Sequence, residues 1–371
     1  MDVVKLLPAN LPSGKKILWK QIDSEKIEVS VDKNSARGGN AKPIVIKRFI
    51  EINELLFEGL GLRFGDGIKL QAGENRIFGF SNTNLELVKY FLKFAKECFG
   101  IESYHFRVAL TIPPKLKNNL EEIEKNISKD FNIPRKNFFK SRILGQTNYP
   151  IVNLSISSRL LAMVILWVYE NLKEILFSNS RFCAAFLRGV IASEGNISFG
   201  YKSQRLGDIT IGAKEKSERD LIRQLLLKLQ IVPDRDKEIR GQECVLITGL
   251  SNFKIMDKWN LCSLQSIKQR DFKIGLSNFK VEQSRKGELR LKVLQLLSEK
   301  SRSRQELGKL LNRSPATIKT EALYVLEKQG LVERGEIENK TRLWKITERG
   351  LNLLKDEEAL EKLKSRESTL P

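Results

Sequence analysis

Two nine-residue segments share one pattern, in which a run of small and apolar residues ends in an acidic residue followed by glycine. The first, over residues 59–67, reads GLGLRFGDG, and the second, over residues 187–195, reads LRGVIASEG. Both carry a small residue at the third and the seventh position: Gly61 and Gly65 in the first, Gly189 and Ser193 in the second. Because residues four apart lie on one face of a helix, the pattern predicts two helices that each present a narrow face.

Two narrow faces can pack backbone against backbone, which predicts a central pair of helices. Each helix ends in a carboxylate, Asp66 in the first segment and Glu194 in the second. Packing of the pair would bring both carboxylates to the same end. Carboxylate oxygens are ligands that Mg²⁺ prefers, and metal ions held between such acids can promote phosphodiester hydrolysis. The alternative is that each acid–glycine pair is only a helix stop at a packing seam.

The order of elements after each segment also repeats. The hydrophobic pattern predicts helix–strand–strand–helix–strand–helix twice. The copies share almost no identity outside their first helices, and a period of about 130 residues is too long for a solenoid. We therefore predict an α+β domain over residues 43–284, built from two pseudo-symmetric αββαβα half-domains with antiparallel sheets, about 43–177 and 178–284. A small N-terminal extension, residues 1–42, precedes it.

The composition excludes several other kinds of site and location. The chain has one histidine, His105, and four cysteines without a C-x-x-C pair. This argues against a histidine metal centre, a Ser-His-Asp triad and a zinc site. The longest apolar run, Leu160–Val168, is much shorter than the ~20 residues of a membrane span. The N-terminus has no secretory signal pattern. We expect a cytoplasmic protein with buried, reduced cysteines and no membrane partner.

The charge indicates a polyanionic partner. The 65 Lys and Arg residues outnumber the 45 Asp and Glu residues, which gives a formal net charge of +20. The excess is spread along the chain, since the last part, residues 285–371, and the rest are both basic. An excess of this size favours nucleic acid as the partner.

These features together resemble the single-chain, two-motif form of the LAGLIDADG homing endonucleases, over roughly Lys42–Phe279. The resemblance implies that the motif helices form the interface between the halves and that the antiparallel sheets form a saddle over the DNA major groove. It implies that Asp66 and Glu194 hold Mg²⁺. The function implied is a sequence-specific, Mg²⁺-dependent endonuclease of double-stranded DNA.

Four further site residues follow from the same resemblance. Family members carry a basic residue after the last strand of each half, which implies Lys254 and Arg159. A polar residue at the end of the second strand approaches the site, which implies Asn82 and Lys214. The alternative is that these four are solvated charges or helix caps of a basic protein.

The sequence departs from the family pattern at three positions. Arg63 and Phe64 stand where the family usually has an apolar residue and an acid, and Ala192 replaces an acid of the second motif. The terminal acids, which the chemistry needs, are both retained.

The last part, residues 285–371, shows a different pattern. Helices are predicted over Gly287–Lys300, Arg304–Leu311 and Pro315–Gln329, and strands over Leu331–Arg334 and Leu343–Thr347. This order resembles a winged helix-turn-helix domain, whose third helix enters the major groove while the wing touches the DNA backbone. The resemblance implies six DNA-contacting residues: Arg313, Thr317, Lys319, Thr320, Lys340 and Arg342. Some winged helices bind only protein, which is the alternative here.

Three functions are open on the sequence alone. The first is the endonuclease. The second is a DNA-binding regulator that does not cleave, because bacterial WhiA-type regulators also join a LAGLIDADG-like domain to a C-terminal helix-turn-helix. The third is an RNA maturase or processing factor. The retained acids favour cleavage, because two carboxylates in a tight seam repel each other without a metal. Two motifs in one chain predict a monomer, since the internal pseudo-symmetry already closes the interface.

Overall fold

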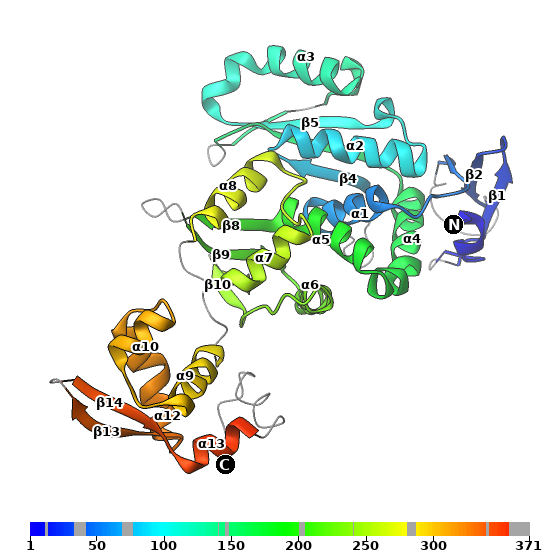
Figure 1. The fold of residues 1–371 in the computed structure, drawn as a ribbon. Coiled ribbons are helices and arrows are strands. Elements are labelled where there is room, and N and C mark those ends of the chain that lie inside the picture. The colour runs from blue at the N-terminus through cyan, green and yellow to red at the C-terminus, as the bar shows by residue number, and fades with distance from the viewer. Residues whose placement is uncertain are drawn as a thin grey trace. The chain divides into compact units, whose positions relative to one another are not determined.

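Two helices, α1 (Glu54–Asp66) and α5 (Ser180–Glu194), pack side by side in the larger unit of the computed structural model (Figure 1). Each begins at an asparagine. The Asn53 side chain accepts a 3.0 Å hydrogen bond from the Leu56 amide, and Asn179 accepts one of 2.9 Å from the Arg181 amide. Asparagine caps a helix well because its oxygen satisfies an amide that has no partner in the first turn. The two caps therefore set where the motif helices start.

The structure describes residues 1–11, 14–32, 42–68, 77–139, 141–144, 148–199, 205–239, 241–279, 287–338 and 341–355. The chain divides into two units. The first consists of Met1–Thr248 and Asn252–Asn278, and the second of Gly249–Ser251 and the chain from Phe279 on. Among the described residues, no helix is long and apolar enough to cross a membrane.

The first half of the larger unit holds a four-stranded sheet in the order β4-β7-β5-β6. Its strands are β4 (Ile77–Asn82), β5 (Arg107–Ile112), β6 (Arg142–Ile143) and β7 (Ile151–Ser157). Its longer helices after α1 are α2 (Leu85–Phe99), α3 (Leu120–Phe131) and α4 (Arg159–Ser178). Short 3₁₀ helices are η2 (Ser103–His105), η3 (Pro114–Asn119) and η4 (Arg135–Asn137).

Alternation along these strands separates a buried face from a polar face. Phe78 and Phe80 of β4 are fully buried, and Phe80 stacks on Phe91 of α2 with ring centroids 4.7 Å apart. On the opposite face, the Ser81 hydroxyl bonds to Asn153 of β7 at 2.6 Å. Successive residues of a strand point to opposite faces, so one side of the sheet forms the core and the other stays polar.

The second half holds a matching four-stranded sheet in the order β10-β11-β9-β8. Its strands are β8 (Gly195–Phe199), β9 (Leu206–Gly212), β10 (Lys237–Ile239) and β11 (Gln242–Ile247). Its helices after α5 are α6 (Lys216–Lys228), α7 (Leu250–Lys258) and α8 (Ser266–Ser277). All its neighbouring strands are antiparallel.

The predicted α+β class with antiparallel sheets is confirmed. One strand pair is an exception, because β5 and β6 run parallel over two residue pairs. The sequence pattern also predicts a strand over Ile68–Ala72, and from position 69 on this segment lies outside the described residues. Among the described strands and α-helices of the larger unit, four had not been predicted: a strand over Ile44–Lys47, the short strands β6 and β10, and the helix α8.

An N-terminal sheet of three antiparallel strands precedes the first motif helix. Its strands are β1 (Ile17–Gln21), β2 (Lys26–Val31) and β3 (Ile44–Lys47), after a short 3₁₀ helix, η1 (Val3–Leu6). The third strand falls after position 42, so the sheet extends into the region that the sequence assigned to the first half-domain. In the larger unit this sheet is a separate layer.

The second unit combines helices with a three-stranded sheet in the order β12-β14-β13. Its strands are β12 (Arg302–Ser303), β13 (Val332–Glu338) and β14 (Thr341–Ile346). Its helices are α9 (Glu288–Glu299), α10 (Arg304–Leu310), α11 (Pro315–Thr317), the π-helical η5 (Ile318–Leu323), α12 (Tyr324–Lys328) and α13 (Glu348–Lys355). The core of this unit includes Leu294, Leu323 and Trp344.

Candidate active site

The motif helices α1 and α5 approach until their backbones touch. A β-carbon at Gly61 would lie 2.2 Å from the carbonyl oxygen of Phe186, and one at Gly189 would lie 2.2 Å from that of Glu58. Real β-carbons do not approach a carbonyl oxygen so closely. The structure therefore leaves room for glycine alone at these two positions of the seam.

The same seam brings the ends of the two helices together. A β-carbon at Gly65 would meet Oγ of Ser193 at 2.0 Å and Cγ of Glu194 at 2.9 Å. The Ser193 hydroxyl stays within its own helix, where it donates to the carbonyls of Gly189 and Val190 at 3.0 and 3.1 Å. The side chain of Glu194 thus leaves α5 directly beside the last turn of α1, which ends at Asp66.

Each acid also contacts the sheet of its own half. The Asn82 amide, at the end of β4, donates a 2.6 Å hydrogen bond to Oδ2 of Asp66. Oε2 of Glu194 lies 3.3 Å from the position of a β-carbon on Gly212, the last residue of β9. Both acids are partly buried. Two carboxylates from different halves are therefore held at the junction of two helix ends and two strand ends.

A lysine that the sequence did not single out lies at this junction. The Lys268 ammonium, on α8, donates to the carbonyls of Ile191 and Ala192 at 2.9 and 2.6 Å. These carbonyls belong to the last turn of α5, the negative end of its dipole. Burial lowers the pKa of Lys268 to about 8, while the negative charges of Asp66 and Glu194 act to raise it. Lys268 is therefore within electrostatic range of both acids.

The other predicted site residues have different surroundings. Arg159 is the first residue of α4, next to the cap Ser158. Lys214 is exposed, two residues beyond the end of β9, and Lys254 is exposed on α7. Within the described part of the chain, neither Arg159 nor Lys214 forms an ion pair with Asp66 or Glu194. Of the four residues added from the resemblance, Asn82 bonds directly to an acid.

The departures from the family pattern have their own packing. The Phe64 ring meets the Phe186 ring of α5 edge-on, with centroids 5.6 Å apart. Burial lowers the pKa of Arg63 to about 10, and its charge interacts with Tyr169 of α4. Ala192 is buried, and its carbonyl accepts from Lys268. These positions thus support the packing around the helix pair.

Buried ion pairs join the motif helices away from the acid junction. Nε of Arg188 donates to Glu58 at 2.6 Å, and its Nη2 pairs with Glu54. Tyr90 of α2 donates to the second oxygen of Glu58, and Arg181 also pairs with Glu54. Arg188 and Glu58 are buried. This network connects α1, α2 and α5 across the two halves.

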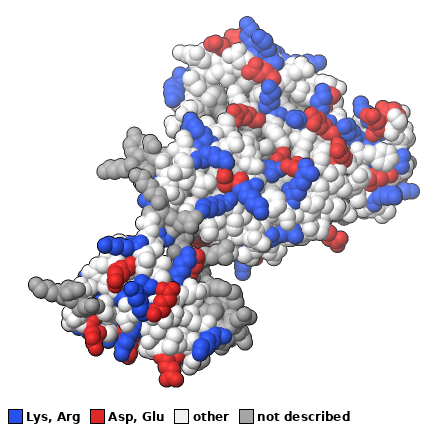
Figure 2. Space-filling model, viewed as in Figure 1, with Lys and Arg blue, Asp and Glu red and all other residues white. Residues whose placement is uncertain are grey.

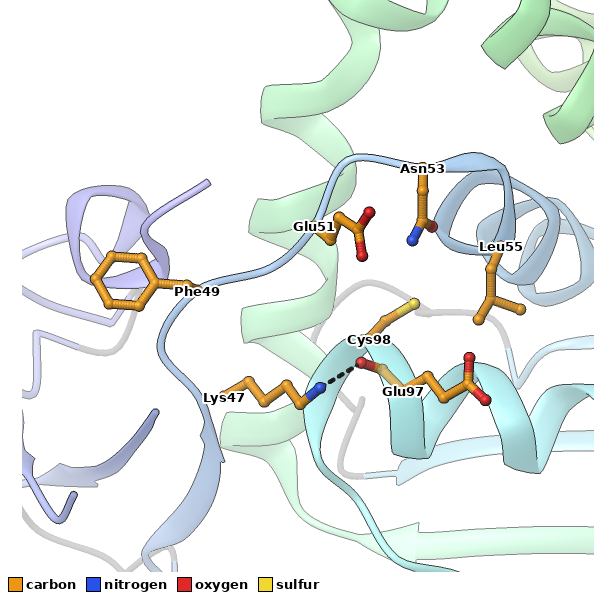
Figure 3. Close-up of a pocket in the computed structure, with 7 residues that line it drawn as sticks. All are labelled: Lys47, Phe49, Glu51, Asn53, Leu55, Glu97 and Cys98. Atoms are coloured by element: carbon orange, nitrogen blue, oxygen red, sulfur yellow. Dashed lines mark hydrogen bonds between the residues drawn. The ribbon is translucent and has the colours of Figure 1, made fainter. Parts of the chain in front are cut away.

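A polar pocket lies at the start of α1 (Figure 3). It is lined by Lys47, Phe49, Glu51, Asn53, Leu55, Glu97 and Cys98. Lys47 Nζ donates to the Glu97 carbonyl at 2.8 Å. Asn53 precedes the first residue of α1 and Asp66 is its last, so at ~1.5 Å per residue the two lie about 20 Å apart. The pocket is separate from the carboxylate junction.

In the second unit, three of the predicted DNA contacts, Thr317, Lys319 and Thr320, lie on α11 and η5. The hydroxyls of Thr317 and Ser314 bond at 2.8 Å, and Thr320 Oγ1 donates to the Ala316 carbonyl at 3.0 Å. Lys319 Nζ lies 5.0 Å from the centre of the Tyr324 ring. Thr320 is exposed, Lys319 and Arg313 are half-buried, and Arg342 lies on β14. Lys340 lies outside the described residues.

Basic side chains are distributed over both units. Figure 2 shows Lys and Arg on the face drawn of each unit, with Asp and Glu between them. The net positive charge is therefore not concentrated in one element.

The second motif helix begins a segment with a known counterpart. Residues 181–258 match a family model, the LAGLIDADG-like domain. This match confirms the LAGLIDADG resemblance for the segment from α5 to α7. No curated protein matches the chain in sequence.

Solved structures that resemble the chain include those of DUF199/WhiA and of the homing endonuclease I-DmoI. Full-length DUF199/WhiA from Thermatoga maritima is 16% identical, with 72% of this chain and 88% of that chain covered and a TM-score of 0.37. I-DmoI in complex with DNA and Ca is 18% identical, with 58% of this chain and 96% of that chain covered and a TM-score of 0.31.

Proposed function

We propose that the chain is a sequence-specific endonuclease of double-stranded DNA that uses Mg²⁺ held by Asp66 and Glu194. One observation carries the proposal: the Glu194 side chain lies against Gly65, at the last turn of the helix that ends in Asp66. Two acids from two pseudo-symmetric halves thereby meet on the seam. Such a pair of acids matches duplex DNA, in which each of the two strands has one phosphodiester bond to be cut.

The chemistry of the donor set fits a hard cation. Asp66 and Glu194 offer carboxylate oxygens, and the described residues contain no cluster of three or more His, Cys, Asp or Glu side chains. Mg²⁺ is commonly held by one or two carboxylates, with water and substrate phosphates in its other positions. When bound, the metal supplies an activated water and stabilises the leaving 3′-oxygen.

The chain's own residues have distinct parts in this proposal. Asp66 and Glu194 hold the metal, and Asn82 fixes the orientation of Asp66 through its amide. The polar sheet face that carries Ser81 and Asn153 would follow the DNA. Lys254, Arg159 and Lys214 are proposed to balance the charge of the phosphates.

We also propose that the second unit is a winged helix that adds DNA affinity. Its three-stranded sheet and the helix from Pro315 provide a hairpin and a recognition helix, as in that fold. Lys319, Thr317 and Thr320 would reach bases or phosphates, and Arg313, Arg342 and Lys340 would bind phosphates. The whole chain would act as a monomer, because its two halves supply both acids.

A second candidate is a DNA-binding regulator that does not cleave. The position of Lys268 favours it, since an ammonium at the end of α5 can offset part of the charge of the two acids without a metal. Repulsion between the acids is therefore not by itself a reason for a metal. A third candidate is an RNA-processing factor, and competition between RNA and duplex DNA for the protein tests it.

Cleavage of plasmid that carries the protein's own gene and flanking DNA tests the first candidate. We expect Mg²⁺-dependent cutting by the wild type and its loss, by at least about 100-fold, in the Asp66→Asn/Glu194→Gln double variant. The matched control is Glu122→Gln/Asp130→Asn, which makes the same changes at exposed residues of α3.

Binding measurements separate the remaining candidates. Tight binding without cutting by either protein would leave the regulator. RNA that competes better than duplex DNA would leave the processing factor. On duplex DNA, log K should fall with log salt by ~0.9 per phosphate neutralised.

A further inference from the structure

A cation of the protein itself lies at the end of α5, the helix that carries Glu194. Lys268 reaches the junction from α8, the helix that the sequence did not predict. Two of its N–H bonds go to the carbonyls of Ile191 and Ala192. Its third N–H has no hydrogen-bond partner among the described residues. Its charge is held at the end of α5, three residues or fewer from Glu194.

We propose that the Lys268 ammonium is the resident counter-ion of Asp66 and Glu194, and that a divalent cation competes with it for these carboxylates. This inference rests on the proposed function, because it concerns the same two acids. It adds a metal-independent state of the site, in which the ammonium offsets part of the charge of the two acids.

The competition follows from the charges at the junction. Two ionised carboxylates repel each other in a partly buried seam, and one ammonium offsets part of that repulsion. A divalent cation at the same oxygens would lie close to the ammonium, and two like charges at short range oppose each other. Lys268 should therefore stabilise the metal-free helix pair and weaken metal binding.

Hydrogen bonds hold the Lys268 ammonium in place. This favours competition between the ammonium and a metal ion over displacement of the ammonium from the site. The two carbonyl acceptors are fixed in place by helix α5, and that of Ile191 also accepts from the Gly195 amide. The ammonium cannot move far from the acids without giving up both hydrogen bonds. The charge of Lys268 would therefore still repel a bound metal ion and lower the affinity of the site for it.

Calcium titration of matched variants tests whether Lys268 competes with a divalent cation for Asp66 and Glu194. Lys268→Met removes the charge and keeps an unbranched chain of similar length. Lys273→Met makes the same change on the same helix, at a lysine that pairs with Asp257. We expect at least tenfold tighter Ca²⁺ binding by Lys268→Met in titration calorimetry, and wild-type affinity for Lys273→Met. Adding Asp66→Asn/Glu194→Gln to Lys268→Met should abolish the gain.

A measurement on the wild type covers the case in which Lys268→Met does not fold. In protein with ¹³C-labelled lysine side chains, the Lys268 signal is identified as the one missing from Lys268→Arg. Addition of Ca²⁺ should shift this signal in the wild type and leave it unchanged in Asp66→Asn/Glu194→Gln.

Two results would overturn the inference: unchanged or weaker Ca²⁺ binding by a folded Lys268→Met, or a Lys268 signal that does not respond to Ca²⁺. Failure of the proposed function looks different. A wild type that never cuts DNA, together with a tenfold gain in Lys268→Met, rejects the nuclease and keeps the counter-ion. A wild type that cuts, with unchanged affinity in Lys268→Met, rejects the counter-ion alone.

Discussion

The side-chain amide of Asn82 donates a 2.6 Å hydrogen bond to Oδ2 of Asp66, which ties the end of β4 to the end of α1. The same amide is held on its other side, because its oxygen accepts a 2.7 Å hydrogen bond from the backbone of Asn84. The nitrogen is thereby directed at the acid. A donor that is fixed in this way keeps one oxygen of the Asp66 carboxylate oriented.

Replacement of Asn82 should therefore weaken the acid junction. We expect Asn82→Ala to lower Ca²⁺ affinity and any cleavage rate by about 10-fold, the lower end of the effect of residues that orient metal ligands. Asn82→Asp should do more harm, because it adds a negative charge beside Asp66. Calorimetry with Ca²⁺ measures both. Asn171→Ala makes the same change at an exposed residue of α4 and is the control, and an equal loss there would mean general damage to the fold.

The contact between the motif helices should not tolerate a methyl group. Gly189→Ala places a β-carbon against the Glu58 carbonyl, and Gly61→Ala places one against that of Phe186. Either helix has to shift, and overpacking of this kind costs about 3 kcal/mol. Urea denaturation should show the loss for each variant. Gly207→Ala is the control, since its nearest neighbours lie at 3.6 Å, an ordinary contact distance.

The sequence could predict the helix pair because the signal is local. Residue size at Gly61 and Gly189 and the acid–glycine ends are readable without any tertiary information. Binary patterning likewise predicts α2 and β7 closely, since a buried face has to recur at a fixed period. The start of α1 is harder to predict: the hydrophobic period runs from Ile50 to Phe64, whereas the Asn53 cap makes the helix begin at Glu54.

Lys268 could not be predicted from the sequence for a physical reason. It lies 77 residues from Ile191, its hydrogen-bond acceptor, so the contact exists only once both elements have folded. A lysine in a helix is most often a solvated charge, and nothing local distinguishes this one. Lys254 fitted the expected position in the chain, yet in the structure it is an exposed residue of α7.

The cysteines should be unreactive in the native protein. Burial raises the pKa of Cys98, Cys183 and Cys262 to about 12 in each case, and it also raises that of Cys244. The thiolate is the nucleophile, so such thiols should react at pH 8 at least about 100-fold more slowly than unfolded ones. Ellman's reagent measures this, and denaturant should release all four thiols. Fast reaction of Cys262 in the native state would contradict its burial.

The ion pairs between α1 and α5 should make the free energy of unfolding depend on pH in the acidic range. Burial by itself raises the pKa of Glu54, but Arg181 and Arg188 outweigh it and hold the pKa below its ordinary value of 4.5. A carboxyl with a lowered native pKa stabilises the fold above its unfolded pKa, and that stabilisation is lost as the pH falls below about 4.5. Glu54→Gln should therefore flatten the fall of the unfolding free energy between pH 5 and 3, as measured by urea denaturation. Glu174→Gln, on α4, should keep the wild-type slope.

Of the two arginines in this network, the buried Arg188 should contribute more to the free energy of unfolding than the exposed Arg181. Arg188→Met leaves Glu58 buried without its 2.6 Å partner, and removal of one member of a buried pair costs about 3–5 kcal/mol. Arg181→Met removes only the exposed arm of the network and should cost about 1 kcal/mol or less. Equal losses of unfolding free energy in the two variants would show that the buried position of Arg188 adds nothing to its contribution to stability. A loss confined to Arg188→Met, partly restored by adding Glu58→Gln, would show that the uncompensated carboxylate is what destabilises the helix pair.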